Sequence, residues 1–124
     1  MPRAVYIVVS SSNDPAREQE FQDWYTVHAR DILSVPGVVA GTRYWLADQI
    51  NPGVLNPGQG RYLAVWEIDA DDPAAVVANI WKGSRQWSAE GRGTDLFEMV
   101  YHGIYQPITD RMQGTPLPAQ SAAQ

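Results

Sequence analysis

The chain has 124 residues, 44% of them hydrophobic, and a formal net charge of -5 at pH 7. This length suits one domain with a single core, and the acidic balance excludes the basic face that a nucleic-acid binder needs. The absence of cysteine excludes disulfides, thiolate nucleophiles and cysteine-based zinc sites. No stretch approaches the roughly 20 apolar residues of a membrane helix, and the apolar run near the N-terminus is too short for a signal peptide. We therefore expect a cytoplasmic protein that binds no membrane.

The first half of the chain predicts a strand, a helix and a second strand. Residues 4–10, AVYIVVS, form a β-branched and aromatic run typical of a strand covered on both faces. A helix is predicted from Pro15 to Val35, with Asp14 as its N-cap. It ends at the sequence VPG, because a proline disfavours helix in the residue before it. Residues 38–48 then predict a second strand.

The second half repeats this pattern after a long loop. Residues 49–60 contain two Asn-Pro-Gly turns, and such a loop is either functional or a surface insertion. Strands are predicted at 61–69 and 96–108, with a helix between them that starts at Pro73 after an Asp72 cap. We assign residues 1–108 to one domain and residues 109–124 to a C-terminal tail, which is either disordered or an arm over a partner subunit.

The order strand, helix, strand, strand, helix, strand predicts an α+β fold, the ferredoxin-like βαββαβ plait. Its four-stranded antiparallel sheet carries both helices on one face. The first strand is nevertheless apolar on both sides, because every residue of 4–9 is apolar. The uncovered face then needs a second layer, and another copy of the chain is the simplest candidate. We therefore predict a homodimer.

His28 stands out on the first predicted helix, because it lies on the apolar face. Imidazole exchanges protons near neutral pH, so His28 is a candidate general acid or base. The structural alternative is a core histidine bonded to a backbone carbonyl or a tyrosine. The apolar face at the i, i+3, i+4 spacing consists of Phe21, Trp24, Tyr25, His28, Ile32 and Val35.

The stretch Glu20–Trp45 resembles the EthD-like branch of the dimeric α/β-barrel superfamily. The resemblance consists of an aromatic pair, a histidine, a Leu-rich stretch, a Pro-Gly and a strand with Arg and Tyr: Trp24-Tyr25, His28, Ile32-Leu33, Pro36-Gly37 and Arg43-Tyr44. It implies a homodimer whose sheets face each other as a barrel, with a pocket between helices and sheet in each subunit. It also implies cofactor-independent enzymes such as polyketide cyclases, muconolactone isomerases and monooxygenases. Val27 departs from the pattern, because relatives commonly have an acid there.

A general base on a carbonyl compound needs a partner that stabilises the oxyanion formed. Arg43 and Tyr44 are adjacent on a predicted strand, so only one of them can face the pocket. The resemblance to isomerases favours Tyr44, and the alternative for Arg43 is a charge at the surface or the dimer interface. Tyr25, one turn before His28, is a candidate for orienting the imidazole or for ordinary packing.

The remaining candidates would line a substrate pocket. The tryptophans Trp24, Trp66, Trp81 and Trp87 are either walls for a planar apolar substrate or core residues. Glu67 and His102 lie on later strands and would join His28 only if both faced its side. A metal site made of these three residues would need convergence that the spacing does not specify. The sequence has no Gly-rich phosphate loop, so we expect neither a cofactor nor a metal.

These observations favour a small enzyme that carries out cofactor-independent proton transfer on a carbonyl-bearing or aromatic metabolite. The step would be an isomerisation, cyclisation or lyase reaction with His28 as general acid or base. A second hypothesis is a non-catalytic small-molecule binding or assembly module of the same fold. A third is cofactor-free oxygenation of an electron-rich quinol.

Overall fold

The computed structural model describes residues 4–50 and 60–119. The predicted βαββαβ order is confirmed, with short helical turns before α1 and after α2. The elements are β1 (Ala4–Ser12), η1 (Pro15–Arg17), α1 (Glu18–Leu33), β2 (Val38–Trp45), β3 (Tyr62–Ile68), α2 (Pro73–Trp87), η2 (Ser88–Arg92) and β4 (Phe97–Tyr105).

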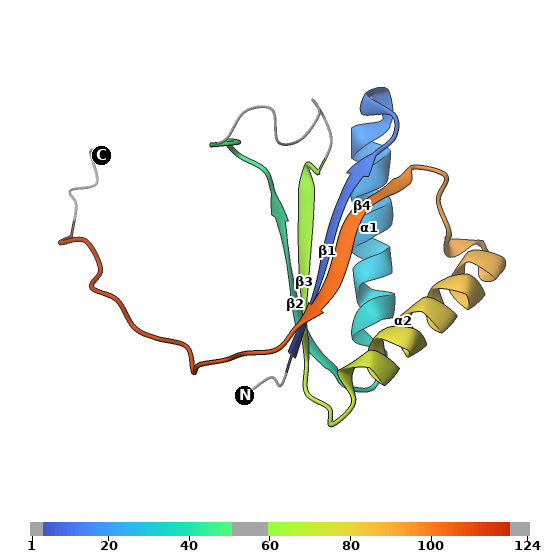
Figure 1. The fold of residues 1–124 in the computed structure, drawn as a ribbon. Coiled ribbons are helices and arrows are strands. Elements are labelled where there is room, and N and C mark those ends of the chain that lie inside the picture. The colour runs from blue at the N-terminus through green and yellow to red at the C-terminus, as the bar shows by residue number, and fades with distance from the viewer. Residues whose placement is uncertain (1–3, 51–59, 120–124) are drawn as a thin grey trace.

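The four strands form one antiparallel sheet in the order β2-β3-β1-β4. Both helices cover the same face of this sheet, and the other face carries no layer from the described part of the chain (Figure 1). The chain therefore has the predicted ferredoxin-like plait. The two central strands, β1 and β3, contribute the most deeply buried positions, while β2 and β4 are the edges.

Both helices begin as predicted, on an aspartate followed by a proline. The Asp14 carboxylate accepts a hydrogen bond from the Ala16 amide at 3.0 Å, and the Asp72 carboxylate accepts one from the Ala75 amide at 3.2 Å. The α-helical part of the first helix is shorter than predicted at both ends. A 3-10 turn occupies Pro15–Arg17, and the α-helix itself runs from Glu18 to Leu33. Such tight turns are common at helix N-termini.

The hydrophobic core lies between the helices and the sheet. On β1 and β3, alternate residues point into it, because successive side chains of a strand lie on opposite faces. The predicted apolar face of α1 packs here through Phe21, Tyr25 and Ile32, all at most 3% exposed. The buried residues of the sheet include Ala4, Tyr6, Val8, Ala64, Trp66 and Ile68.

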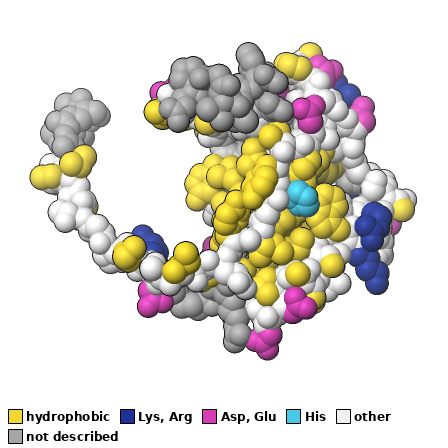
Figure 2. Space-filling view, in the orientation of Figure 1, with side chains coloured by type: hydrophobic (Ala, Val, Ile, Leu, Met, Phe, Trp, Pro, Cys, Tyr) yellow, Lys and Arg dark blue, Asp and Glu magenta, His cyan; other side chains and the backbone are white. Residues whose placement is uncertain are grey.

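The opposite face of the sheet is apolar and open. Val5, Ile7 and Val65 are half-buried there, and Tyr44 is 52% exposed. Figure 2 shows hydrophobic side chains gathered on the side of the sheet that the C-terminal segment curves around. The sheet is therefore apolar on both faces, as the sequence pattern predicted, and one of these faces is uncovered in the single chain.

Residues 106–119 run away from the body of the domain without helix or strand (Figure 1). Three large apolar side chains on this segment are largely exposed: Ile108, Met112 and Leu117. The division at residue 108 and the role of the tail as an arm stay predictions. Most of the Asn-Pro-Gly loop lies outside the described residues. Neither described helix has the length and apolarity needed to cross a bilayer.

Candidate functional site

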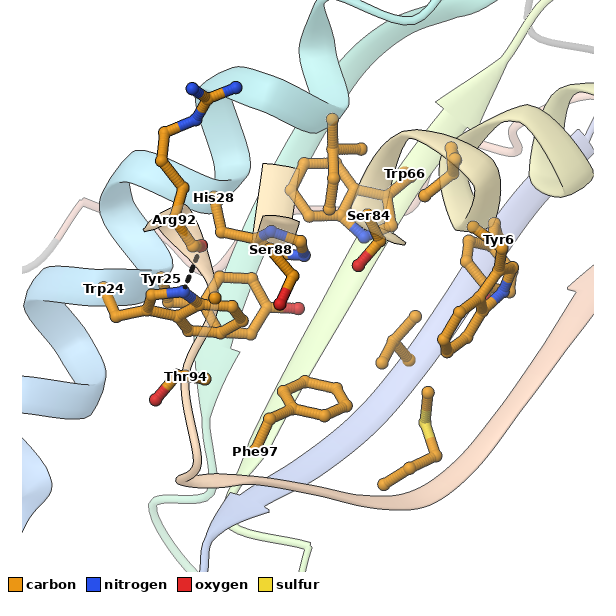
Figure 3. A pocket seen from close by; sticks show the side chains of 16 residues that line it. Tyr6, Trp24, Tyr25, His28, Trp66, Ser84, Ser88, Arg92, Thr94 and Phe97 are labelled. Atoms are coloured by element: carbon orange, nitrogen blue, oxygen red, sulfur yellow. Dashed lines mark hydrogen bonds between the residues drawn. The ribbon is translucent and has the colours of Figure 1, made fainter. Parts of the chain in front are cut away.

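A cavity of about 270 Å³ lies between the two helices and the sheet. Side chains from α1, α2, η2 and three strands surround it, and Figure 3 shows how they converge. Its size suits a small ligand of one or two rings. Aromatic rings supply much of the wall, namely Tyr6, Trp24, Tyr25, Trp66, Trp81 and Phe97. Polar groups reach it at a few points, namely His28, Ser84, Ser88, Arg92 and Thr94.

His28 is one of the lining residues and lies among three aromatic rings. Its imidazole stacks on Trp24 with ring centroids 4.5 Å apart and an interplanar angle of 17°. Tyr25 and Trp87 meet its ring edge-on at 5.6 Å and 5.8 Å. Within the described residues no hydrogen bond holds either ring nitrogen. The geometry therefore differs from that of a core histidine fixed by backbone carbonyls, and the ring nitrogens are available to bind a ligand.

The surroundings of His28 favour its neutral form. Burial among the rings lowers the pKa of the imidazole from 6.5 to about 4, and the positive charge of Arg43 acts in the same direction. The Asp31 carboxylate opposes this by favouring the imidazolium. At neutral pH the imidazole is therefore an unprotonated base in an aromatic cavity.

Asp31 is a residue that sequence reasoning missed. It follows His28 by three positions on α1, which places both side chains on neighbouring parts of the helix surface. Its carboxylate accepts a hydrogen bond from Arg92 Nε at 3.0 Å. That ion pair ties η2, which forms one wall of the cavity, to α1. The Trp24 indole N–H reinforces the link by donating to the Arg92 carbonyl at 2.9 Å (Figure 3).

Trp66 forms the floor of the cavity and carries an unpaired donor. Its side chain is 1% exposed, and its indole N–H has no hydrogen-bond partner in the described part of the chain. A buried donor without a partner costs about 1–3 kcal/mol. Trp66 also lines the cavity, so its N–H is a candidate donor to an acceptor oxygen of a ligand.

Gly41 on β2 makes room for the Trp66 ring. A Cβ atom placed on Gly41 would lie 2.3 Å from Trp66 Cε3, far inside van der Waals contact. We expect Gly41→Ala to push the indole toward the cavity and to lower the free energy of unfolding by about 1–3 kcal/mol. Chemical denaturation followed by tryptophan fluorescence measures this. Gly114→Ala is the matched control, because nothing lies within 4 Å of that position, and an equal effect of both would contradict the packing described.

Arg43 and Tyr44 are separated by the sheet. A bulge between Val38 and Ala40 shifts the register, so that Gly41 and Arg43 share the helix-covered face with Trp66. Arg43 lies with its guanidinium carbon 3.9 Å from the Tyr25 ring centroid and donates to Gln22 Oε1 at 2.8 Å. Tyr44 points to the open face instead. Neither residue lines the cavity, and the structure does not bring Tyr44 to His28.

Tyr25 lies between Arg43 and the cavity. Burial raises the pKa of its phenol to about 12, so its hydroxyl remains protonated at neutral pH and available as a donor. Arg43 partly opposes this shift through its positive charge. Tyr25 lies beside His28, as its position one helical turn earlier predicted, and the two rings meet edge-on.

His28, His102 and Glu67 do not converge. Glu67 pairs with Val5 and lies on the open face of the sheet. His102 lies on the helix-covered face of β4, where its Nδ1 is 2.7 Å from the Tyr6 hydroxyl. The described residues contain no group of three or more side chains placed to hold a metal ion.

Comparison with known proteins identifies the fold. No protein-family model and no curated protein matches the chain in sequence. Among solved structures it is similar to HapK from Hahella chejuensis, at 18% identity and a TM-score of 0.58 over 90% of this chain and 99% of that one. It is also similar to MupZ from Pseudomonas fluorescens, at 15% identity and a TM-score of 0.55 over 87% of this chain and 71% of that one.

A third similar structure is SnoaB from Streptomyces nogalater, described as a cofactor-independent oxygenase and solved in a mutant form. It has 18% identity to this chain and a TM-score of 0.50 over 94% of this chain and 99% of that one. At these identities the comparisons show a shared fold, the ferredoxin-like α+β plait. Function rests on the site itself.

Proposed function

We propose that the protein is a cofactor-independent enzyme of the EthD-like branch that removes a proton from a small, planar, carbonyl-bearing substrate. His28 is the general base. The observation that carries this proposal is a neutral imidazole, free of hydrogen bonds to the described residues, on the wall of an aromatic cavity. A base of this kind contributes about 10²–10⁴-fold to a rate.

The substrate class follows from the lining. Flat aromatic walls favour a planar ligand, and the unpaired Trp66 N–H favours an oxygen acceptor on it. When a proton leaves the carbon next to a carbonyl, negative charge builds on the oxygen. In this proposal the Trp66 N–H stabilises that oxygen. The sequence pattern predicted Arg43 or Tyr44 for this role.

Asp31 and Arg43 set the charge balance around the base. Arg43 disfavours the imidazolium, and Asp31 favours it. During proton transfer the imidazolium and the enolate arise together, so each stabilises the other in a site of low dielectric constant. Asp31 adds to this stabilisation without contacting the substrate.

Hydrogen–deuterium exchange tests the proposal without knowledge of the natural substrate. The protein is incubated in D₂O with 2-tetralone, a planar bicyclic ketone with an acidic α-carbon, and deuterium incorporation is followed by NMR. We expect exchange well above that of buffer alone. Saturable binding of 2-tetralone without any exchange would instead support the non-catalytic binding module.

Cofactor-free oxygenation is the second candidate, favoured by the similarity to SnoaB. It begins with the same step, because an electron-rich carbanion or phenolate is what reacts with oxygen. An oxygen electrode separates the two functions with a naphthohydroquinone as probe. Oxygen uptake that depends on the protein and on His28 would favour the oxygenase, and exchange without uptake would favour the isomerase, cyclase or lyase.

We also propose that the protein acts as a homodimer joined through the open face of the sheet. Val65 is central on that face, in β3, and is half-buried in the single chain. We expect Val65→Asp to convert the dimer to a monomer, because a charge would be buried without a partner. Light scattering after gel filtration measures the mass. Arg30→Gln, exposed on α1, is the control, and a wild-type monomer at micromolar concentration would contradict the proposal. A cytoplasmic location stays a prediction from the sequence.

A further inference from the structure

We propose that Tyr6 and His102 form a second proton-transfer site, which connects the end of the cavity remote from His28 with solvent. This inference rests on the proposed function, because it assigns a second proton-transfer group to the same substrate. It also narrows the reaction. Two such groups on one cavity suit a substrate in which a proton leaves the α-carbon of a ketone and another returns at the γ-carbon of the conjugated enolate.

The two groups lie at separate ends of the cavity. Figure 3 shows Trp24 and His28 on one side and Tyr6 on the other, with Trp66 between them. Tyr6 belongs to the central strand β1 and is 3% exposed. A ligand that contacts both His28 and Tyr6 would lie along the aromatic walls and pass Trp66 on the way.

The Tyr6 hydroxyl is hydrogen-bonded to Trp81 and to His102. The Trp81 indole N–H, 3.0 Å from the Tyr6 oxygen, can only donate. The Tyr6 oxygen therefore accepts that bond. When neutral His102 carries its proton on Nε2, the Tyr6 hydroxyl donates its own proton to Nδ1, 2.7 Å away.

Protonation of His102 reverses the second bond. Nδ1 of the imidazolium becomes a donor to the Tyr6 oxygen, and the Tyr6 proton is released to turn toward the cavity. His102 is exposed to solvent on the edge strand β4, whereas Tyr6 is enclosed. Tyr6 faces His102 from β1, and Trp81 faces it from α2 and carries no charge.

The transfer balances without any co-reactant. In the donating direction the Tyr6 O–H bond breaks and its proton forms a new bond to the substrate. The Nδ1 proton of protonated His102 moves to the Tyr6 oxygen, and His102 ends neutral with its remaining proton on Nε2. The proton that His28 removed returns to water separately, and no electrons are exchanged.

The test uses 3-cyclohexen-1-one, a β,γ-unsaturated ketone, in D₂O. Removal of its α-proton gives a dienolate, which either regains a proton at the α-carbon or takes one at the γ-carbon to form 2-cyclohexen-1-one. NMR follows both products together. Exchange at the α-carbon reports on His28, and the conjugated ketone reports on the second site.

We expect the wild-type protein to form the conjugated ketone, and Tyr6→Phe and His102→Gln each to lower its ratio to α-exchange at least about 10-fold. A purely structural role would lower both products in parallel and leave the ratio unchanged, which would overturn the inference. The Tyr6→Phe variant alters a buried residue and could fail to fold. The His102→Gln variant tests the same site without this problem, because His102 is exposed. Arg30→Gln, exposed on α1, should leave both products unchanged.

The two proposals fail in different ways. If the wild-type protein catalyses α-exchange but forms no conjugated ketone, the Tyr6–His102 site is wrong and the proposed function stands. If it catalyses neither, the proposed function fails and this inference fails with it.

Discussion

Replacement of His28 by glutamine should reduce the rate of 2-tetralone exchange about 10²–10⁴-fold, the range that one general base contributes. Glutamine keeps a polar side chain among the aromatic rings of Trp24, Tyr25 and Trp87 but cannot take up a proton near neutral pH. Binding of 2-tetralone should change much less, because most of the cavity wall is unaltered. The rate is measured by NMR and the dissociation constant by quenching of tryptophan fluorescence.

Arg30→Gln is the matched control for this prediction. It introduces the same side chain two positions further along α1, on the exposed face of the helix. We expect it to retain the wild-type exchange rate. Suppose that the His28→Gln variant catalysed deuterium incorporation into 2-tetralone as fast as the Arg30→Gln variant. His28 would then not be the base, and catalysis would have to come from another group.

The stability of the protein should fall steeply in mild acid, and His28 should account for much of the fall. The folded pKa of His28, about 4, lies below the ordinary value of 6.5. Between these two values the unfolded chain binds a proton that the folded chain does not, so the free energy of unfolding decreases as pH falls through this window. The whole difference amounts to about 3 kcal/mol and is reached near pH 4. Above pH 6.5 the contribution is constant.

Urea denaturation between pH 7.5 and 4 measures this effect as a difference between two proteins. Other groups titrate in the same range and also change the free energy of unfolding. Subtraction of the pH profile of His28→Gln removes their contribution. The variant should lose about 3 kcal/mol less stability than the wild-type protein over this interval. Parallel pH profiles would show that the imidazole is not shielded in the folded state.

The helix that carries His28 was predictable because its apolar face is long and regular. Phe21, Tyr25 and Ile32 repeat at helical spacing and are all buried as expected. The aspartate caps were equally predictable, because the bond from Asp72 to the Ala75 amide depends only on local sequence. The topology followed from the order of these elements and their turns.

The orientation of β2 was not predictable, for a specific reason. Val38 is buried, and strict alternation from it would place Tyr44 on the helix-covered face. The bulge between Val38 and Ala40 reverses the alternation and brings Arg43 to that face instead. Nothing in the alternating apolar pattern marks this bulge.

A similar shift in β4 hid the position of His102. Met99 pairs with Ser10 but Tyr101 with Val9, so one extra residue of β4 lies between these two pairs. The shift places His102 on the helix-covered face, beside Tyr6. Its partner could therefore not be read from strand alternation alone.

The partners that tune the site were also hidden in the sequence. Arg92 reaches Asp31 because the chain turns at Gly91, where φ is +89°, and brings η2 against α1. The unpaired N–H of Trp66 depends on how its ring lies over Gly41. Both features arise from tertiary packing between distant segments, which periodicity and capping rules do not address.

Titration of His28 by NMR is the most direct test of whether its imidazole is a shielded base in the cavity. The chain has only two histidines, so spectra of the wild-type protein and of His28→Gln assign both imidazoles. We predict that His28 titrates with a pKa of about 4 and that addition of 2-tetralone shifts its resonances at pH 7. A pKa at or above 6.5, with resonances that do not respond to the ketone, would contradict a shielded base in a ligand-binding cavity.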